Sequence, residues 1–147
     1  MIYLYIGAGG FLGAVSRYAI DNFATAKFNT AFPVGIFIVN IAGCLLIGFI
    51  MTLALERMVM SANVRMGIVT GFLGGLTTFS TYTYQSLMLM EKGAWGLAVW
   101  YSAVSVITCI FAVWLGVVSA KAIPFLLPKV PVQGNTPADF KNRSDKN

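Results

Sequence analysis

The chain contains no histidine, and its two cysteines, Cys44 and Cys109, each stand inside an apolar run. Zinc sites and disulfide frameworks depend on histidine or on closely spaced cysteines, and no C-x-x-C pair is present. Both cysteines are therefore interpreted as small buried hydrophobes. The apolar runs also hold no acid and no nucleophile–base pair, which argues against an enzyme, so no catalytic residue is predicted.

Charged residues are scarce as well. They make up 10% of the 147 residues, whereas a soluble domain carries roughly 25%. Hydrophobic residues reach 58%, and the mean hydropathy is +0.79. This composition excludes an ordinary soluble domain and predicts an integral membrane protein. The length suits one domain with about four spans of roughly 20 residues each.

Apolar runs separated by polar connectors predict an all-α membrane fold with four transmembrane helices. The runs cover residues 2–20, 33–55, 64–90 and 94–125. The first connector is expected to begin at Asp21 and to end near residue 30. Residues 1–125 are expected to form one transmembrane domain. Residues 126–147 are rich in proline and polar side chains, and are expected to form a disordered polar tail.

Basic residues are divided almost evenly between the two sides of such a bundle. Arg57, Arg65, Lys121 and Lys129 fall on the side of the termini, and Arg17, Lys27 and Lys92 fall on the opposite side. The positive-inside rule therefore gives only a weak preference, and such a subunit can insert either way up. The net charge of +5 comes largely from the tail. It does not form a basic face with polar or aromatic readers, so no nucleic-acid partner is predicted.

Glycines and hydroxyl residues gather in the middle of the third run, over residues 71–82. Gly71, Gly74 and Gly75 favour unwinding, and unwound carbonyls at membrane depth are ligands for a small hard cation. The alternative is a glycine-rich helix packed tightly against a neighbour. In the first run, Gly9 and Gly13 have the G-x-x-x-G spacing that also permits close helix packing.

A stripe of neutral donors is predicted on one face of the third helix, after the glycines. Its members are Thr77, Ser80, Thr81, Tyr84 and Gln85, and the fourth run repeats the spacing with Tyr101, Ser105 and Thr108. Neutral donors suit an anion that must be held and then released. The alternative is hydroxyl bonding between helices, which is common in membrane bundles.

Other side chains carry a functional and a structural interpretation side by side. Asn40 lies inside the second run, where its amide either donates to an anion or bonds a neighbouring helix. Arg17 either forms an electropositive vestibule or extends to the membrane interface. Phe79 and Tyr82 either direct the positive edges of their rings at an anion or simply pack.

These residues together resemble the Fluc (CrcB-type) fluoride ion channel family. The resemblance rests on the segment G-G-L-T-T-F-S-T of the third run, on G-A-V-S-R-Y near Arg17, and on the segment around Asn40. It covers about residues 1–125, which it identifies as a four-helix transmembrane channel domain. It implies an antiparallel, dual-topology dimer in the cell inner (plasma) membrane. It also implies passive fluoride efflux, which lowers cytoplasmic fluoride and gives fluoride resistance.

The resemblance further implies roles for individual residues. A structural sodium ion would be bound by the backbone carbonyls of Gly74 and Thr77, and Arg17 would lie in a vestibule. The fluoride pathway would include Asn40, Phe79, Tyr82, Ser80, Thr81, Tyr101 and Ser105. The third helix would be broken mid-membrane at the sodium site. The implied partners are fluoride, the lipid bilayer and a second subunit, either an identical chain or a paralogue.

Two positions depart from the family's usual pattern. Tyr82 stands where the family usually has a second phenylalanine, and its hydroxyl would either donate to fluoride or obstruct the pathway. Gln85 stands where many members carry a glutamate.

Two rival classes of membrane protein compete with the channel. A proton-coupled multidrug transporter needs a membrane-embedded carboxylate, which the first run does not supply. A membrane scaffold would explain the glycines but not the polar stripe.

Overall fold

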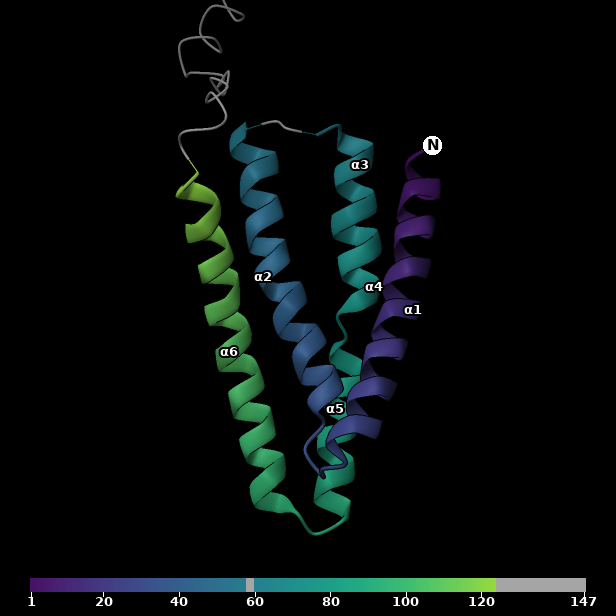
Figure 1. Cartoon of the computed structure of the whole chain (residues 1–147), viewed down its shortest axis with the longest axis vertical. Coiled ribbons are helices and arrows are strands. Elements are labelled where there is room, and N and C mark those ends of the chain that lie inside the picture. Colours follow the sequence, from purple (N-terminus) through teal and green to yellow (C-terminus); the bar gives the residue numbers. More distant parts are fainter. Residues whose placement is uncertain (58–59, 124–147) are drawn as a thin grey trace, which may run out of the picture.

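The computed structural model describes residues 1–57 and 60–123, and every regular element in them is helical. Figure 1 shows that these elements form rods which run up and down, with the N-terminus and the end of the last helix at the same end. The rods are α1 (Ile2–Phe28), α2 (Val34–Arg57), the series α3 (Ala62–Met66), η1 (Gly67–Leu73), α4 (Gly74–Leu76) and α5 (Phe79–Glu91), and α6 (Trp95–Lys121). The predicted all-α fold with four helices is confirmed, while the predicted tail and domain end at Phe125 lie outside the described residues.

Two of these helices are both long and apolar enough to cross a membrane. Among the described residues they are Val34–Leu55 and Trp95–Lys121. At 1.5 Å per residue, the 27 residues of α6 extend about 40 Å, which exceeds the roughly 30 Å of a bilayer's hydrocarbon core. Helix α1 is equally long but carries Arg17 and Asp21 within it. The structure thus indicates a membrane protein, and crossing by all four rods stays a prediction.

The polar connector predicted to begin at Asp21 is wrong, because α1 continues to Phe28. The helix ends only at Asn29, which adopts the left-handed conformation (φ 43°, ψ 46°) and donates its N–H to the carbonyl of Thr25. Ala24 is buried, and Asp21 accepts a hydrogen bond from the backbone N–H of Ile36 in α2. Polar residues here mark the end of the apolar run, but they remain in the helix because tertiary contacts use them.

Helix α1 packs against η1 and α4 through glycines, as the spacing of Gly9 and Gly13 predicted. A Cβ atom on Gly9 would meet the carbonyl of Gly67 and lie 2.8 Å from the backbone nitrogen of Phe72. A Cβ atom on Gly71 would lie 2.6 Å from the carbonyl of Ile6. The two backbones therefore touch along this seam, which leaves no room for side chains.

The third rod is interrupted at Thr77 and Thr78, three residues after Gly74 rather than at the glycines. Gly71, Gly74 and Gly75 are helical, so the expectation that they unwind the chain is wrong. Thr77 (φ −82°, ψ 154°) and Thr78 (φ −153°, ψ 125°) are extended. Before the break, η1 is a seven-residue π-helix, a form that is often found at functional sites. The break turns the α5 segment away from the line of α4 (Figure 1).

Helix α2 packs along α6 on the other side of the bundle. Glycines again permit the approach: a Cβ atom on Gly116 would meet the carbonyl of Leu45, and one on Gly48 would meet the carbonyl of Val113. The buried core lies nearer the α5 end, where Ile36, Leu73 and Tyr101 are almost fully enclosed. From this region α2 and the third rod diverge toward the end of the bundle that holds the N-terminus (Figure 1).

Candidate functional site

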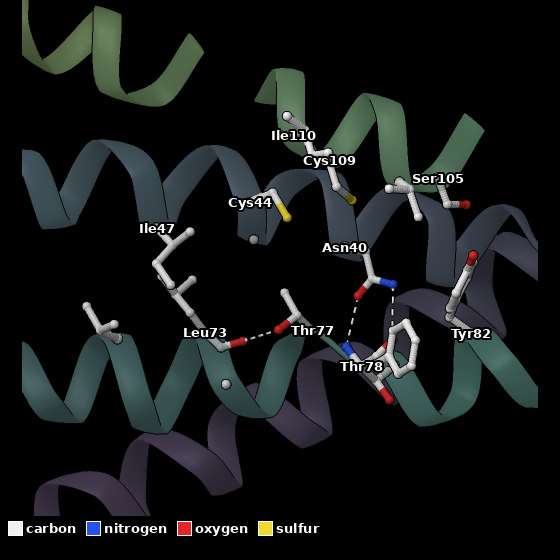
Figure 2. Close-up of a pocket in the computed structure, with 15 residues that line it drawn as sticks. Asn40, Cys44, Ile47, Leu73, Thr77, Thr78, Tyr82, Ser105, Cys109 and Ile110 are labelled. Carbon is white, nitrogen blue, oxygen red and sulfur yellow. Dashed lines mark hydrogen bonds between the residues drawn. The ribbon is translucent and has the colours of Figure 1, made fainter. Parts of the chain in front are cut away.

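A cavity of about 400 Å³ opens beside the break in the third rod. It lies between α2, the segment from η1 to α5, and α6, as Figure 2 shows. Its polar lining comes from Asn40, Thr77, Thr78, Tyr82 and Ser105. Its apolar lining includes Ile47, Val69, Leu73, Phe79, Val106 and Ile110. No charged side chain is among the residues that line it within the described chain.

The break is held in place by one side chain of α2. Asn40 donates from Nδ2 to the carbonyl of Thr78 at 3.1 Å, and its Oδ1 accepts from the N–H of Thr78 at 2.8 Å (Figure 2). This pair of bonds satisfies both backbone groups of an extended residue, which otherwise would be unpaired. Asn40 therefore bonds a neighbouring rod, as its structural interpretation predicted. One Nδ2 hydrogen is not needed for the pair.

Two backbone carbonyls beside the break lose the donors that a continuous helix would supply. The carbonyl of Gly74 would accept from the N–H of Thr78, which donates to Asn40 instead. The carbonyl of Thr77 would accept from the N–H of Thr81, which donates to the Thr78 hydroxyl instead. Gly74 is exposed on the surface of the chain. Carbonyl oxygens left in this way are suitable ligands for a hard cation.

Thr78 is the residue that sequence analysis missed. Its side chain caps α5 by accepting from the N–H of Thr81 at 3.2 Å, and its hydroxyl also lies 3.2 Å from the hydroxyls of Ser80 and Thr81. A threonine directly before a helix, three residues ahead of another polar residue, is a recognised start signal that the sequence did contain. Thr78 thus begins α5 and joins it to Asn40 at the same time.

Aromatic rings form the α5 wall of the pocket. Phe79 and Tyr82 lie with ring centroids 5.4 Å apart at 41°, and Tyr82 lies 5.3 Å from Tyr101 of α6. Phe79 is 74% exposed, whereas Tyr82 is 9% exposed. The Tyr82 hydroxyl donates to the carbonyl of Ser102 at 3.1 Å, and the Tyr101 hydroxyl donates to Gln85 at 3.2 Å. Both tyrosine hydroxyls therefore tie α5 to α6.

Two buried donors have no hydrogen-bond partner within the described chain: Ser105 Oγ and Arg17 Nε. Ser105 is 5% exposed and lines the pocket, and its Oγ is itself buried at the pocket wall. Arg17 lies outside the pocket lining and donates through Nη1 to the hydroxyl of Thr81 at 3.4 Å. A buried donor without a partner carries a penalty of about 1–3 kcal/mol, which a bound acceptor would remove.

The predicted site residues fall into two groups. Asn40, Gly74, Thr77, Phe79, Tyr82 and Ser105 meet around the pocket. Arg17, Ser80, Thr81 and Tyr101 do not line it. Of this second group, Ser80 and Thr81 contact the hydroxyl of the pocket residue Thr78 through their own hydroxyls. Arg17 in turn donates to the hydroxyl of Thr81. Tyr101 is fully buried against Tyr82 and Phe32. The predicted polar stripe is thus divided between a pocket and a supporting network.

The fold and the pocket together indicate a small helical membrane protein with an uncharged pocket. Its pocket gathers neutral donors, aromatic rings and apolar walls, with no carboxylate in the lining. Residues 4–117 match the family model of the CrcB-like protein, Camphor Resistance (CrcB). The chain belongs to the CrcB-like family, as its resemblance to that family predicted.

Curated relatives support the same assignment. The chain is 44% identical over 120 residues to the "Fluoride-specific ion channel FluC" of Geotalea uraniireducens, an alignment that covers 82% of this chain and 97% of the relative. It is 46% identical over 114 residues to the protein of the same name from Chloroflexus aurantiacus, covering 78% and 90%. It is 40% identical to the "Fluoride-specific ion channel FluC 1" of Moorella thermoacetica over 145 residues, covering 99% and 98%. These names describe ion channels, so the family is one of transport and not of catalysis.

Proposed function

We propose that this chain is a subunit of a fluoride-selective channel that lets fluoride leave the cell passively. The names of relatives from the same family support the choice of ion. Hydrogen fluoride enters cells as the neutral acid and ionises inside, so an exit pathway for the anion lowers cytoplasmic fluoride and gives fluoride resistance. The cell inner (plasma) membrane is the location at which such a pathway acts.

The single observation that carries this proposal is the unpaired hydroxyl of Ser105. It is a neutral donor, buried at the wall of a pocket whose lining holds no charge. A small anion can replace part of its hydration with this hydroxyl, with a free Nδ2 hydrogen of Asn40 and with the ring edge of Phe79. A basic side chain directly against the anion would hold it too firmly, whereas neutral donors permit release.

We further propose that two subunits lie antiparallel, either two identical chains or this chain with a paralogue. The carbonyls of Gly74 and Thr77 support this arrangement, because they have lost their helical donors and Gly74 is exposed on one chain. A sodium ion bound there would supply a fixed positive charge shared between the subunits. The described residues contain no cluster of three or more acidic, cysteine or histidine side chains suited to a metal.

Fluoride efflux from liposomes that contain only this purified chain tests the proposed function. We expect fluoride to leave and chloride to be retained, because the larger anion fits poorly among a few short donors. Comparable chloride flux would defeat the proposal. In the same liposomes, Ser105→Ala should lower fluoride flux roughly threefold to tenfold, the value of one hydrogen bond of about 0.5–1.5 kcal/mol.

A neighbouring position on α6 provides the control for that variant. Thr108 does not line the pocket, and its hydroxyl donates to the carbonyl of Val104 at 2.6 Å within its own helix. Thr108→Ala should therefore leave fluoride flux unchanged. Ser105→Ala removes no hydrogen bond of the folded chain, so its thermal stability should not fall. Equal flux in both variants would remove Ser105 from the pathway.

The orientation of the subunits has a separate test. A tag at one terminus is probed with an impermeant reagent from each side of the membrane in turn. An antiparallel pair of identical chains should expose about half of the tags on each side. A single uniform orientation would exclude that homodimer and would leave the pair with a paralogue as the arrangement to examine.

A further inference from the structure

The two cysteines of the chain meet in the structure although they stand far apart in the sequence. Cys44 of α2 and Cys109 of α6 both line the pocket, both are free thiols, and their side chains lie close enough to interact. Figure 2 shows their sulfur atoms on the pocket side of the two helices. Because α2 and α6 pack along each other, this pair bridges two rods of the molecule.

The surroundings of the pair decide which ligand it can accept. Ile47, Val106 and Ile110 line the same wall, and none of the described residues that line the pocket is charged. A cation bound here receives no compensation from a carboxylate, and an uncompensated charge in an apolar setting is strongly unfavourable. Two thiolates carry two negative charges, so a divalent cation bound to both forms a neutral complex.

We propose that Cys44 and Cys109 form a two-thiol site for a soft divalent cation, with Hg²⁺ as its probe. Soft thiolate ligands select soft metals, whereas hard cations such as Mg²⁺ and Ca²⁺ require oxygen ligands. On binding, both S–H bonds break, two protons pass to water, and two metal–sulfur bonds form. The product joins α2 to α6 and carries no net charge.

Occupation of this site also closes the pocket. The pair shares the cavity with Asn40 and Ser105, so a bound metal fills space through which an anion would have to pass. This consequence rests on the proposed function, whereas binding of the metal does not. The two parts can therefore fail separately.

Mercury retention by the full-length chain tests the binding. The purified protein is treated with one equivalent of HgCl₂, washed with glutathione, and its mercury content is measured. The wild-type chain should keep about one mercury per chain, because the second thiol binds at a high effective concentration. Cys44→Ser and Cys109→Ser should each release mercury at glutathione concentrations on the order of a hundredfold lower. Mg²⁺ at the same concentration should not be retained.

Equal retention by the single variants and the wild type would overturn the proposal, since each thiol would then bind alone. Complete loss from the wild type would overturn it as well. Cys44→Ala and Cys109→Ala repeat the comparison with a small apolar side chain, in case serine disturbs folding. In liposomes, HgCl₂ should block fluoride flux of the wild type and spare the variant with both cysteines replaced. Retained mercury with unchanged flux would overturn closure of the pocket.

Discussion

The seam between α1 and η1 and the pocket beside α5 use small and polar residues in opposite ways. At the seam, Gly9 and Gly71 bring two backbones into contact, and both residues remain helical. At the pocket, Thr77 and Thr78 leave the helix, and their polar groups bond to other parts of the chain. The glycines therefore permit close packing of the two rods, and the threonines form the break in the third rod.

This contrast has a physical basis. Glycine in a membrane helix is tolerated because packing against a neighbour offsets its flexibility. A residue can leave the helix only where another group satisfies its backbone, and Asn40 provides that group for Thr78. Close packing makes the scaffold rigid. The hydrogen bonds that Asn40 makes to Thr78, in place of helical ones, leave carbonyls and hydroxyls beside a cavity. Variants at the seam and variants at the pocket should therefore affect different measurements.

The largest effect is expected at the seam, from Gly9→Ala. The new Cβ atom would collide with the backbone of Gly67 and Phe72, which cannot move aside as a flexible side chain would. We expect a loss of about 1–3 kcal/mol or more in the free energy of unfolding, with a lower yield of folded protein. Thermal unfolding in detergent measures it.

Gly7 supplies the matched control for this variant. It lies in the same helix, and a Cβ atom there would have nothing within 4 Å. Gly7→Ala should be neutral or stabilising by up to about 1 kcal/mol, because alanine favours the helix. If Gly9→Ala is as stable as Gly7→Ala, the seam is not a backbone contact.

A second large effect is expected at the break, from Asn40→Ala. Removal of the amide leaves the N–H and carbonyl of Thr78 without partners, at about 1–3 kcal/mol for an unsatisfied group. Fluoride flux should fall by about tenfold or more, because the pocket loses a donor and the geometry of the break. Flux and thermal stability are measured together.

Asn22 is an exposed asparagine on α1, and Asn22→Ala serves as the control. It should leave both measurements unchanged. A stable Asn40→Ala protein with normal flux would show that the break does not need the two hydrogen bonds between Asn40 and Thr78. The contrast between seam and pocket would then lose its main support.

A smaller effect, confined to flux, is expected from Phe79→Ile. The side chain is 74% exposed, so the folded state should tolerate the change. Isoleucine retains bulk and apolarity but has no positive ring edge. We expect fluoride flux to fall roughly tenfold, which corresponds to about 1.4 kcal/mol. Normal flux in the well-folded variant would contradict an interaction between the ring edge of Phe79 and the anion. It would not affect the roles proposed for the other donors.

Phe111→Ile provides the comparison on α6. Phe111 is also exposed, and it does not line the pocket. Its replacement should leave fluoride flux unchanged. A similar loss in both variants would attribute the effect to general changes at the lipid-facing surface rather than to the pocket.

The smallest effect is expected from Tyr82→Phe, which introduces the phenylalanine that the resemblance to the family implies at this position. The variant loses the hydrogen bond from the Tyr82 hydroxyl to the carbonyl of Ser102, worth about 0.5–1.5 kcal/mol of stability. Fluoride flux should change little, because the hydroxyl is already engaged with α6 and the ring remains. A threefold to tenfold loss of flux at unchanged stability would instead assign the hydroxyl to the ion.

Sequence alone determined the class of fold and several residues of the pocket. A low content of charge and apolar runs of about 20 residues predict helices in a membrane, because a helix satisfies its backbone groups within the segment. Asn40 and Ser105 stood out because polar side chains are unfavourable within such runs. The spacing of Gly9 and Gly13 likewise predicted close packing, since helical geometry places them on one face.

Tertiary structure decided the rest. Asn40 finds Thr78 across 38 residues, and that contact determines where the third rod breaks, which glycine content could not show. The first helix extends past Asp21 because a carboxylate of α1 accepts from the backbone of α2. Cys44 and Cys109 become neighbours only when α2 packs on α6. Local patterns report what a residue prefers, but a hydrogen bond or thiol pair between distant segments exists only once packing has brought both partners together.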